Sequence, residues 1–279
     1  MTERGKTGQG KAGANTIGRT MRMLELLAGE PRGLRITDLA NELGLNRAIP
    51  HRVLADLIKL GYVAQDPRTE RYRVTFKLGS LGLRQLESAG TARWAQDQLD
   101  KLAAETRELV RLAIASGDTL TWVAKAQGSA SALTYDGVSG AQVVLHATAS
   151  GKAWLATLPD EEVAGILTEH GLDAQTTHTE TELARILREL EAARASGHAV
   201  VEEEMEVGVS AIAAPIVPPE SVDGRAVATV SIAGPAARLD HDRLVSLAPQ
   251  LQAVTTELGA QWHTYEYLTA LSGLADEDV

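Results

Sequence analysis

The sequence contains no cysteine among its 279 residues and a single phenylalanine. The lack of cysteine excludes a disulfide-stapled scaffold and any zinc or iron–sulfur site that depends on cysteine ligands. No run of about 18 uninterrupted apolar residues occurs, which excludes a membrane-spanning helix. Residues 1–14 are polar and rich in glycine and lysine, so they lack the apolar core of a secretory signal. We therefore expect a cytoplasmic protein, and its length favours two domains.

Acidic and basic residues are distributed unevenly along the chain. Residues 1–86 contain 15 Lys and Arg against 8 Asp and Glu, whereas residues 87–279 contain 12 against 29. This distribution indicates that only the first part of the chain meets a polyanion, because an acidic surface repels one. Charge asymmetry alone fits a basic patch without a partner equally well.

Residues 16–76 have the pattern of three short helices followed by a hairpin. The first helix follows an N-cap at Thr16, the second begins near Thr37 and closes at Gly44, and the third covers residues 47–60. Two short β-rich runs then flank a turn signal at residues 66–69. This order predicts a winged helix-turn-helix whose third helix enters the major groove of DNA. Three-helix patterns also occur in protein-interaction modules, but the wing and the positive charge favour DNA.

The predicted helices are amphipathic. In the first helix we expect a buried stripe of Ile17, Met21, Leu24, Leu27 and Ala28. In the third helix the expected buried stripe is Val53, Leu54, Leu57, Ile58 and Leu60. Small and basic residues occupy the opposite face of the third helix, where phosphate contacts provide affinity and residues near the helix start read bases. The candidate DNA-binding residues are Thr37, Asn46, Arg47, Ala48, Ile49, His51, Arg52, Arg71 and Arg73.

The pattern changes after residue 75. Helices are predicted over residues 75–86 and 91–108. Helices that link two domains in this way either pair two subunits or pack within one chain, and both alternatives stay open. Four groups of elements are then predicted. Strands at 109–115, 119–125, 130–135 and 142–146 are followed by helices at 149–157, 161–169 and 180–196. Strands at 198–202, 209–217 and 226–233 come next, and a helix at 240–259 is last. Helices grouped between antiparallel strands predict an α+β sandwich of the sensor type and disfavour a βαβ nucleotide fold.

Enzyme and metal motifs are weak. Gly151 and Lys152 do not form a phosphate-binding loop, because Ala153 replaces the required Ser or Thr. No G-x-S-x-G motif occurs, and the histidines of the second part lie in different predicted elements. The acidic run at residues 202–206 alternates between two faces of a strand, which favours a solvated edge over a cation site. We expect no metal and no cofactor.

Several segments resemble the IclR family of bacterial transcription regulators. They are IGRTMRMLELL, ITDLANELGLNRAIPHRVLADLIKLGYVAQDPRTERYRV, LHATASGKAWLATLP, GVSAIAAPIV and VATVSIAGPAARLD. Their order and spacing extend over roughly residues 16–260. The resemblance implies a winged helix-turn-helix joined to a GAF/PAS-like α+β domain that binds a small organic effector. It also implies homodimers, or dimers of dimers, on double-stranded operator DNA. No membrane partner is expected.

The resemblance also divides the chain. It implies a DNA-binding domain over residues 16–76, a linker helix over 77–92 and an effector-binding domain over 93–262. Outside the resemblance, the residue pattern predicts a disordered basic arm over 1–15 and an acidic tail over 263–279. Where the family usually offers small hydroxyl residues at the start of the recognition helix, this chain has Ala48 and Ile49. These two apolar side chains can contact thymine methyl groups instead.

In the effector domain the resemblance assigns a pocket to the segment that begins at His146 and to two strands. The candidate effector-binding residues are His146, Ala147, Thr148, Ala149, Ser150, Gly151, Val209, Ala211, Ser231 and Ala233. The helix that starts near Ala149 offers backbone N–H groups to a carboxylate, which predicts an acidic effector. Alanine and valine at positions 211, 233 and 201 favour an aromatic or aliphatic body. Two other functions stay open, namely a DNA-tethered enzyme and a protein-interaction adaptor.

Overall fold

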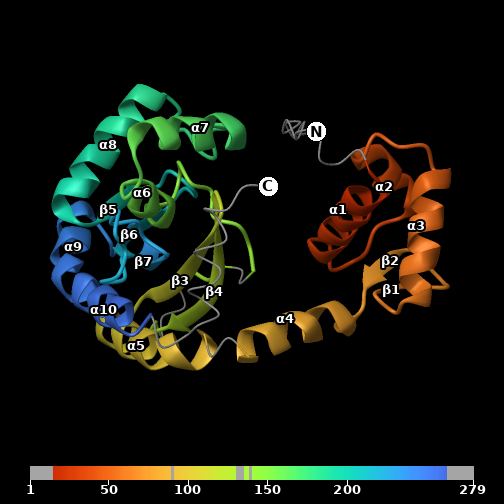
Figure 1. Cartoon of the computed structure of the whole chain (residues 1–279), viewed down its shortest axis with the longest axis horizontal. Helices are drawn as coiled ribbons and strands as arrows, with labels where there is room; N and C mark the ends of the chain where they lie inside the picture. The colour runs from red at the N-terminus through yellow and green to blue at the C-terminus, as the bar shows by residue number, and fades with distance from the viewer. Residues whose placement is uncertain (1–14, 89–90, 130–134, 138–139, 263–279) are drawn as a thin grey trace. The chain divides into compact units, whose positions relative to one another are not determined.

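The computed structural model describes residues 15–129, 135–137 and 140–262, except 89–90 (Figure 1). The chain divides into two compact units, with the division after Ser88. The predicted basic arm, the acidic tail and the predicted strand at 130–135 lie almost entirely outside the described residues. None of the described helices is long and apolar enough to cross a membrane.

The first unit is the predicted winged helix-turn-helix followed by one more helix (Figure 1). Its elements are α1 (Thr16–Ala28), α2 (Ile36–Glu42), α3 (Ala48–Lys59), β1 (Val63–Gln65), β2 (Tyr72–Val74) and α4 (Phe76–Ser88). Strands β1 and β2 pair antiparallel and form the wing. Gly44 and Gly61, at φ of +62° and +77°, reverse the chain after α2 and α3, a conformation that glycine adopts without steric cost.

Helix ends in the first unit are capped differently from the prediction. Asn15 caps α1, since its side-chain Oδ1 accepts the Gly18 N–H at 2.7 Å. Helix α2 begins before Thr37, and Asp38 Oδ2 accepts the Arg35 N–H at 3.0 Å. Thr37 therefore lies inside the first turn and is not the cap. Short polar side chains compete for these free N–H groups, so sequence alone places a cap only to within a residue or two.

The buried faces of α1 and α3 are only partly those predicted. Met23, Leu24 and Leu27 supply the core of α1, whereas Ile17 and Met21 are 74% and 52% exposed. In α3, Val53, Leu54 and Leu57 are buried in this small core, whereas Ile58 and Leu60 lie outside it and are exposed. The two predicted helices are confirmed, but the predicted set of buried residues is too large in both.

The second unit is an α+β sandwich (Figure 1). Its elements are α5 (Thr91–Thr106), β3 (Leu109–Ser116), β4 (Thr119–Gln127), α6 (Ala149–Leu155), α7 (Asp160–His170), α8 (Leu183–Ser196), β5 (Ala199–Glu202), β6 (Val209–Ile216), β7 (Ala228–Pro235), α9 (His241–Ser246) and α10 (Ala248–Ala260). The five strands form one antiparallel sheet in the order β4-β3-β7-β6-β5. The predicted α+β fold class is confirmed.

Each face of the sheet has its own hydrophobic core. On one face Val110 and Leu112 of β3 pack with residues of α5 and α10. On the other face Ala113 of β3 packs with Trp154 of α6 and with residues of α7 and α8. Successive side chains of a strand point to opposite faces, so Arg111, between Val110 and Leu112, lies on the α6 face.

Two predicted elements of the second unit differ in the structure. Residues 142–146 form no strand beyond a single bridge between Gln142 and Thr121, and the following residues turn into α6. The predicted helix at 240–259 is broken at Leu247 into α9 and α10. Pro249 lies in the first turn of α10, where the N–H that proline lacks has no partner within the helix. In the interior of one continuous helix the same proline would remove a hydrogen bond and clash with the preceding turn.

Candidate functional site

The exposed face of α3 carries the predicted DNA-reading residues. Arg47, His51 and Arg52 are exposed, and among the described residues none of the three forms an ion pair or a side-chain hydrogen bond. Ala48 is exposed beside them and Ile49 is half-buried. Buried Val53 and Leu54 hold the opposite face of the helix against the core. The fold therefore presents unpartnered positive charge on a rigid helix.

The remaining residues of that prediction are engaged within the unit. Asn46 Oδ1 accepts the Ala48 N–H at 3.1 Å and so fixes the start of α3. Thr37 is half-buried, and its hydroxyl contacts Asp38 Oδ1 at 3.4 Å. On the wing, Arg71 Nη1 donates to the Gly33 carbonyl at 2.6 Å, whereas Arg73 is exposed and has only a 3.9 Å ion pair with Asp66. Of the two wing arginines, Arg73 is the freer to contact a ligand.

A pocket lies in the second unit between α6 and the sheet, and we call it the α6 pocket. Its enclosed space is small, about 30 Å³. Eight residues predicted from the sequence line it, namely Ala147, Thr148, Ala149, Ser150, Val209, Ala211, Ser231 and Ala233. The remaining lining residues are Arg111, Trp122, Tyr135, Val201 and Met205. His146 and Gly151 lie outside this lining.

Gly151 and Thr148 fix the position of the first turn of α6 beside the pocket. A Cβ on Gly151 would lie 2.2 Å from the Leu145 carbonyl oxygen, so only glycine allows this close approach of α6 to the preceding turn. Thr148 Oγ1 accepts the Gly151 N–H at 3.1 Å and donates to the Val144 carbonyl at 2.8 Å. These contacts fix the first turn of α6 and leave the Thr148 hydroxyl no free hydrogen for a ligand.

His146 belongs to a buried polar cluster next to the pocket. Its Nε2 lies 3.1 Å from the Asp173 carbonyl oxygen. Burial lowers the pKa of His146 below the ordinary value, the nearby Lys152 ammonium lowers it further, and the Asp173 hydrogen bond opposes the shift. The imidazole is therefore neutral at neutral pH. Its surroundings give it a structural role, which the sequence did not distinguish from a lining role.

Lys152 connects α6 to the turn that carries Met205. Its side chain is 3% exposed, and its Nζ lies 2.7 Å from Glu189 Oε2 and 2.5 Å from Glu204 Oε1. The Glu204 carbonyl also accepts the Thr179 hydroxyl at 2.6 Å. Met205 follows Glu204 directly and lines the α6 pocket. The ion pairs therefore hold one wall of the pocket in place.

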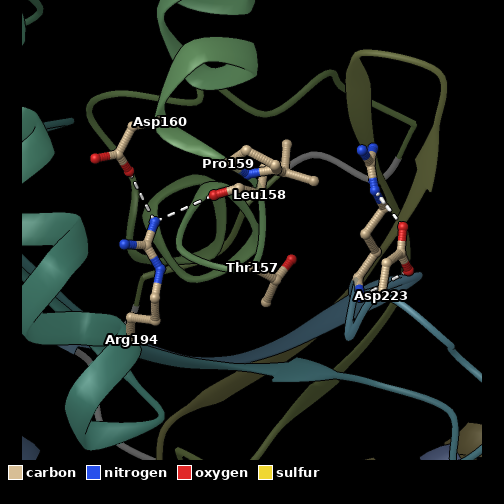
Figure 2. Close-up of a pocket in the computed structure, with 7 residues that line it drawn as sticks. Thr157, Leu158, Pro159, Asp160, Arg194 and Asp223 are labelled. Carbon is tan, nitrogen blue, oxygen red and sulfur yellow. Dashed lines mark hydrogen bonds and ion pairs between the residues drawn. The ribbon is translucent and has the colours of Figure 1, made fainter.

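A larger depression on the surface of the same unit is a poor binding site. Figure 2 shows Arg194 reaching toward Leu158 and Asp160 at its rim, with Asp223 on the other side. Arg194 Nη2 donates to the Leu158 carbonyl at 3.1 Å and to Asp160 Oδ1 at 3.0 Å. Arg225 is bound by two oxygens of Glu162, at 2.7 and 2.6 Å, and by Asp223. Both guanidinium groups are already neutralised.

No group of three or more His, Asp or Glu side chains that can hold a metal ion occurs among the described residues. The acidic segment at 202–206 is engaged in internal contacts instead. Glu202 pairs with His241, and Glu203 accepts the Gly208 N–H at 2.7 Å. Together with the Lys152 contact of Glu204, these interactions account for three of its four carboxylates.

Comparison with known proteins covers both units. Residues 16–67 match the IclR helix-turn-helix domain, and residues 83–260 match the C-terminal domain of the bacterial transcriptional regulator IclR. The chain is 30% identical over 239 residues to the HTH-type transcriptional regulator KdgR of Dickeya chrysanthemi, an alignment that covers 86% of this chain and 77% of KdgR.

Solved structures agree with these matches. An IclR transcriptional regulator from Silicibacter sp. TM1040 superimposes with a TM-score of 0.76 at 25% identity, covering 88% of this chain and 96% of that one. An IclR homolog from Microbacterium hydrocarbonoxydans, complexed with 4-hydroxybenzoate, shares the fold with a TM-score of 0.71 at 19% identity, covering 90% of this chain and all of that one. The chain therefore belongs to the IclR family of bacterial transcriptional regulators, which bind DNA and carry a C-terminal effector domain.

Proposed function

We propose that this protein is a transcriptional regulator whose affinity for operator DNA is set by a small organic acid bound in the α6 pocket. The observation that carries the proposal is a convergence of unsatisfied polar atoms. Arg111 Nε, Ser150 Oγ and Ser231 Oγ are buried, have no hydrogen-bond partner among the described residues, and all belong to residues that line this pocket. Buried polar groups without partners are rare in folded proteins and mark places where a ligand completes the hydrogen bonding.

The DNA contacts follow from the exposed face of α3. Arg47 and Arg52 carry charge without an internal partner, so we assign them to phosphate or guanine contacts. His51 lies beside them, and we assign Ala48 and Ile49, at the start of the helix, to contacts with thymine methyl groups. Arg73 of the wing supplies a further phosphate contact.

We further propose that the protein acts as a homodimer or as a dimer of dimers. Phe76 and Leu83 of α4 are 89% and 64% exposed, and Leu81 is also exposed. Exposed apolar residues gathered on one helix are typical of a surface that a second protein chain covers. Two winged helices in a symmetric dimer would read two half-sites separated by one or more turns of the DNA helix.

The experiment that tests the function is a binding titration with the DNA upstream of the protein's own gene. Fluorescence anisotropy would be measured with and without a panel of carboxylic acids that includes 4-hydroxybenzoate. A coupling free energy of about 1–3 kcal/mol between the two sites changes the DNA affinity about 5- to 150-fold. Specific DNA binding that an acid shifts in either direction supports the proposal. Turnover of an acid would indicate the tethered enzyme, and absence of specific DNA binding would indicate the adaptor.

Filling the α6 pocket is expected to abolish the response to the acid while DNA affinity is retained. The substitution Ala211→Leu adds three carbons at the pocket wall, and overpacking of this size costs about 1–3 kcal/mol, which corresponds to a loss of ligand affinity of about 5- to 150-fold. Calorimetry with the active acid would measure the loss. Ala192→Leu, on the exposed face of α8, makes the same chemical change away from the pocket and serves as the control. Wild-type acid affinity in the Ala211→Leu variant would remove the pocket from the mechanism.

A further inference from the structure

Arg111 is a charged residue in the middle of a buried strand. The other residues of β3 from Leu109 to Ala113 are apolar and buried, and Arg111 itself is only 8% exposed. Its guanidinium carbon lies 3.7 Å from the centre of the Trp122 ring and 5.5 Å from the centre of the Tyr135 ring. The two aromatic rings hold the guanidinium at the wall of the α6 pocket through cation–π contact.

No described residue of the unit forms an ion pair with Arg111. Among the described residues no carboxylate oxygen lies within 4 Å of its guanidinium, and its Nε has no hydrogen-bond partner. Asp136, on the segment nearby, is ion-paired with Lys125 Nζ at 2.5 Å. Burial lowers the pKa of Arg111, while Tyr135 and Asp136 oppose that shift. Arginine nevertheless stays protonated in proteins, so a cation is held here without a counter-ion.

Two other charged groups that are buried in this unit, Lys152 and Glu108, are each neutralised by a partner of opposite charge. Lys152 is paired with Glu189 and Glu204. Arg238 binds both carboxylate oxygens of the buried Glu108, at 2.7 and 2.8 Å. A buried charge without such a partner destabilises a fold by several kcal/mol. The contrast indicates that the partner of Arg111 is a molecule from outside the chain.

Two hydroxyl groups without partners stand near this cation in the same pocket. Ser231 of β7 is directly opposite Arg111 in the antiparallel pairing of β3 and β7. Ser150 lines the pocket from α6, across from the sheet. A hydroxyl donates one hydrogen bond and a guanidinium donates several, so the three side chains together suit a group with several acceptor oxygens. Helix α6 has only seven residues, which leaves Arg111 as the main source of positive charge.

We propose that Arg111 is the anion-recognition residue of the α6 pocket and that it selects effectors with a carboxylate group on a compact apolar body. Arg111, Ser150 and Ser231 bind the carboxylate, and the apolar body packs against the side of the pocket formed by Met205 and Val209. The enclosed space is small, about 30 Å³, which favours a compact effector. This inference rests on the proposed function, since it names the chemical class that the effector pocket takes.

The first test compares acids with their neutral isosteres. Benzoate, 4-hydroxybenzoate, phenylacetate and 4-methylpentanoate would each be titrated into the wild-type protein by calorimetry beside the corresponding primary amide. Charge-assisted hydrogen bonds contribute enough that at least one acid is expected to bind about 10- to 100-fold more tightly than its amide. Equal binding of acid and amide, or binding by none of the acids, would overturn the proposal. The DNA titration distinguishes the two failures: if an acid shifts the DNA affinity but binds no more tightly than its amide, the role of Arg111 is wrong and the proposed function stands.

The second test removes the guanidinium. Arg111→Gln is expected to reduce the affinity for the bound acid about 10- to 100-fold and to leave the affinity for its amide unchanged, whereas Arg111→Lys keeps the charge but loses the planar fork and recovers only part of the affinity. Thermal unfolding separates binding from structure. Without ligand, the melting temperature of Arg111→Gln should equal or exceed that of wild type, because an unneutralised buried charge is removed.

Arg238→Gln serves as the control, because it removes the cation that neutralises the buried Glu108 carboxylate and should lower the melting temperature. Wild-type acid affinity in Arg111→Gln would overturn the assignment. So would a melting temperature lowered as far as that of Arg238→Gln, because a structural arginine behaves in that way.

Discussion

Replacing Arg52 with alanine is expected to weaken binding to the upstream DNA about 10-fold or more and to make the residual binding less sensitive to salt. Arg52 is exposed on α3 and has no ion pair or side-chain hydrogen bond among the described residues, so the change removes a DNA contact without disturbing the fold. A charge-assisted hydrogen bond contributes about 1.5–3 kcal/mol. Affinity for DNA falls as the salt concentration rises, and the loss of one phosphate contact makes this fall shallower: the magnitude of the slope of log affinity against log salt concentration decreases by about one.

The measurement is anisotropy across a salt series, with wild type and variant side by side. Arg188→Ala is the control, because Arg188 is an exposed arginine on α8 of the acidic unit and its loss changes the net charge by the same amount. The Arg52→Ala variant should keep the wild-type affinity for the effector. If its DNA affinity and salt slope match those of Arg188→Ala, α3 does not contact DNA through this residue.

The substitution Lys152→Ala is expected to lower the free energy of unfolding of the second unit by about 3–5 kcal/mol. Lys152 is buried and neutralises Glu189 and Glu204, so its removal leaves the largely buried Glu204 carboxylate without a counter-ion. Urea unfolding followed by circular dichroism would measure the change. The control is Lys125→Ala, since Lys125 pairs with Asp136 at the surface, where an ion pair contributes less than about 1 kcal/mol.

A double variant identifies the cause of that loss. Lys152→Met with Glu204→Gln removes both buried charges, so its unfolding free energy should lie above that of Lys152→Ala. The same network anchors the turn before Met205, and Lys152→Ala should therefore also weaken acid binding in the α6 pocket. A stability loss in Lys152→Ala as small as in Lys125→Ala would show that Glu204 finds other partners when the ammonium is absent.

Much of the fold could be predicted because its signals are local. Gly44 and Gly61 end α2 and α3 at the predicted residues, and both adopt positive φ. Which residues of a helix are buried depends on the elements that pack against it, and a single sequence does not show these elements. Ile17 and Met21 continue the apolar spacing of Leu24 and Leu27, yet the core of this unit reaches only the last turns of α1.

The pocket was predictable only in part. The eight lining residues found from the sequence came from the resemblance to a family. Arg111, Trp122 and Tyr135 were missed because strand pairing and the return of the 135–137 segment bring them together. One signal was present, since Arg111 interrupts the apolar run LVRLAIA, and a charge inside a buried strand calls for a partner. No pattern in the sequence told His146 apart from the lining residues.

Strand β3 takes part in both cores of the second unit at once. Arg111 faces the α6 pocket, while its neighbours Val110 and Leu112 pack with Leu99 and Leu102 of α5 on the reverse side of the sheet. If Arg111 binds the effector as proposed, the effector contacts the same strand that packs against α5, the first helix after the DNA-binding unit in the chain. The sheet therefore has the effector pocket on one face and, on the other, the helix through which the chain enters this unit, so the two are separated by the thickness of a single strand.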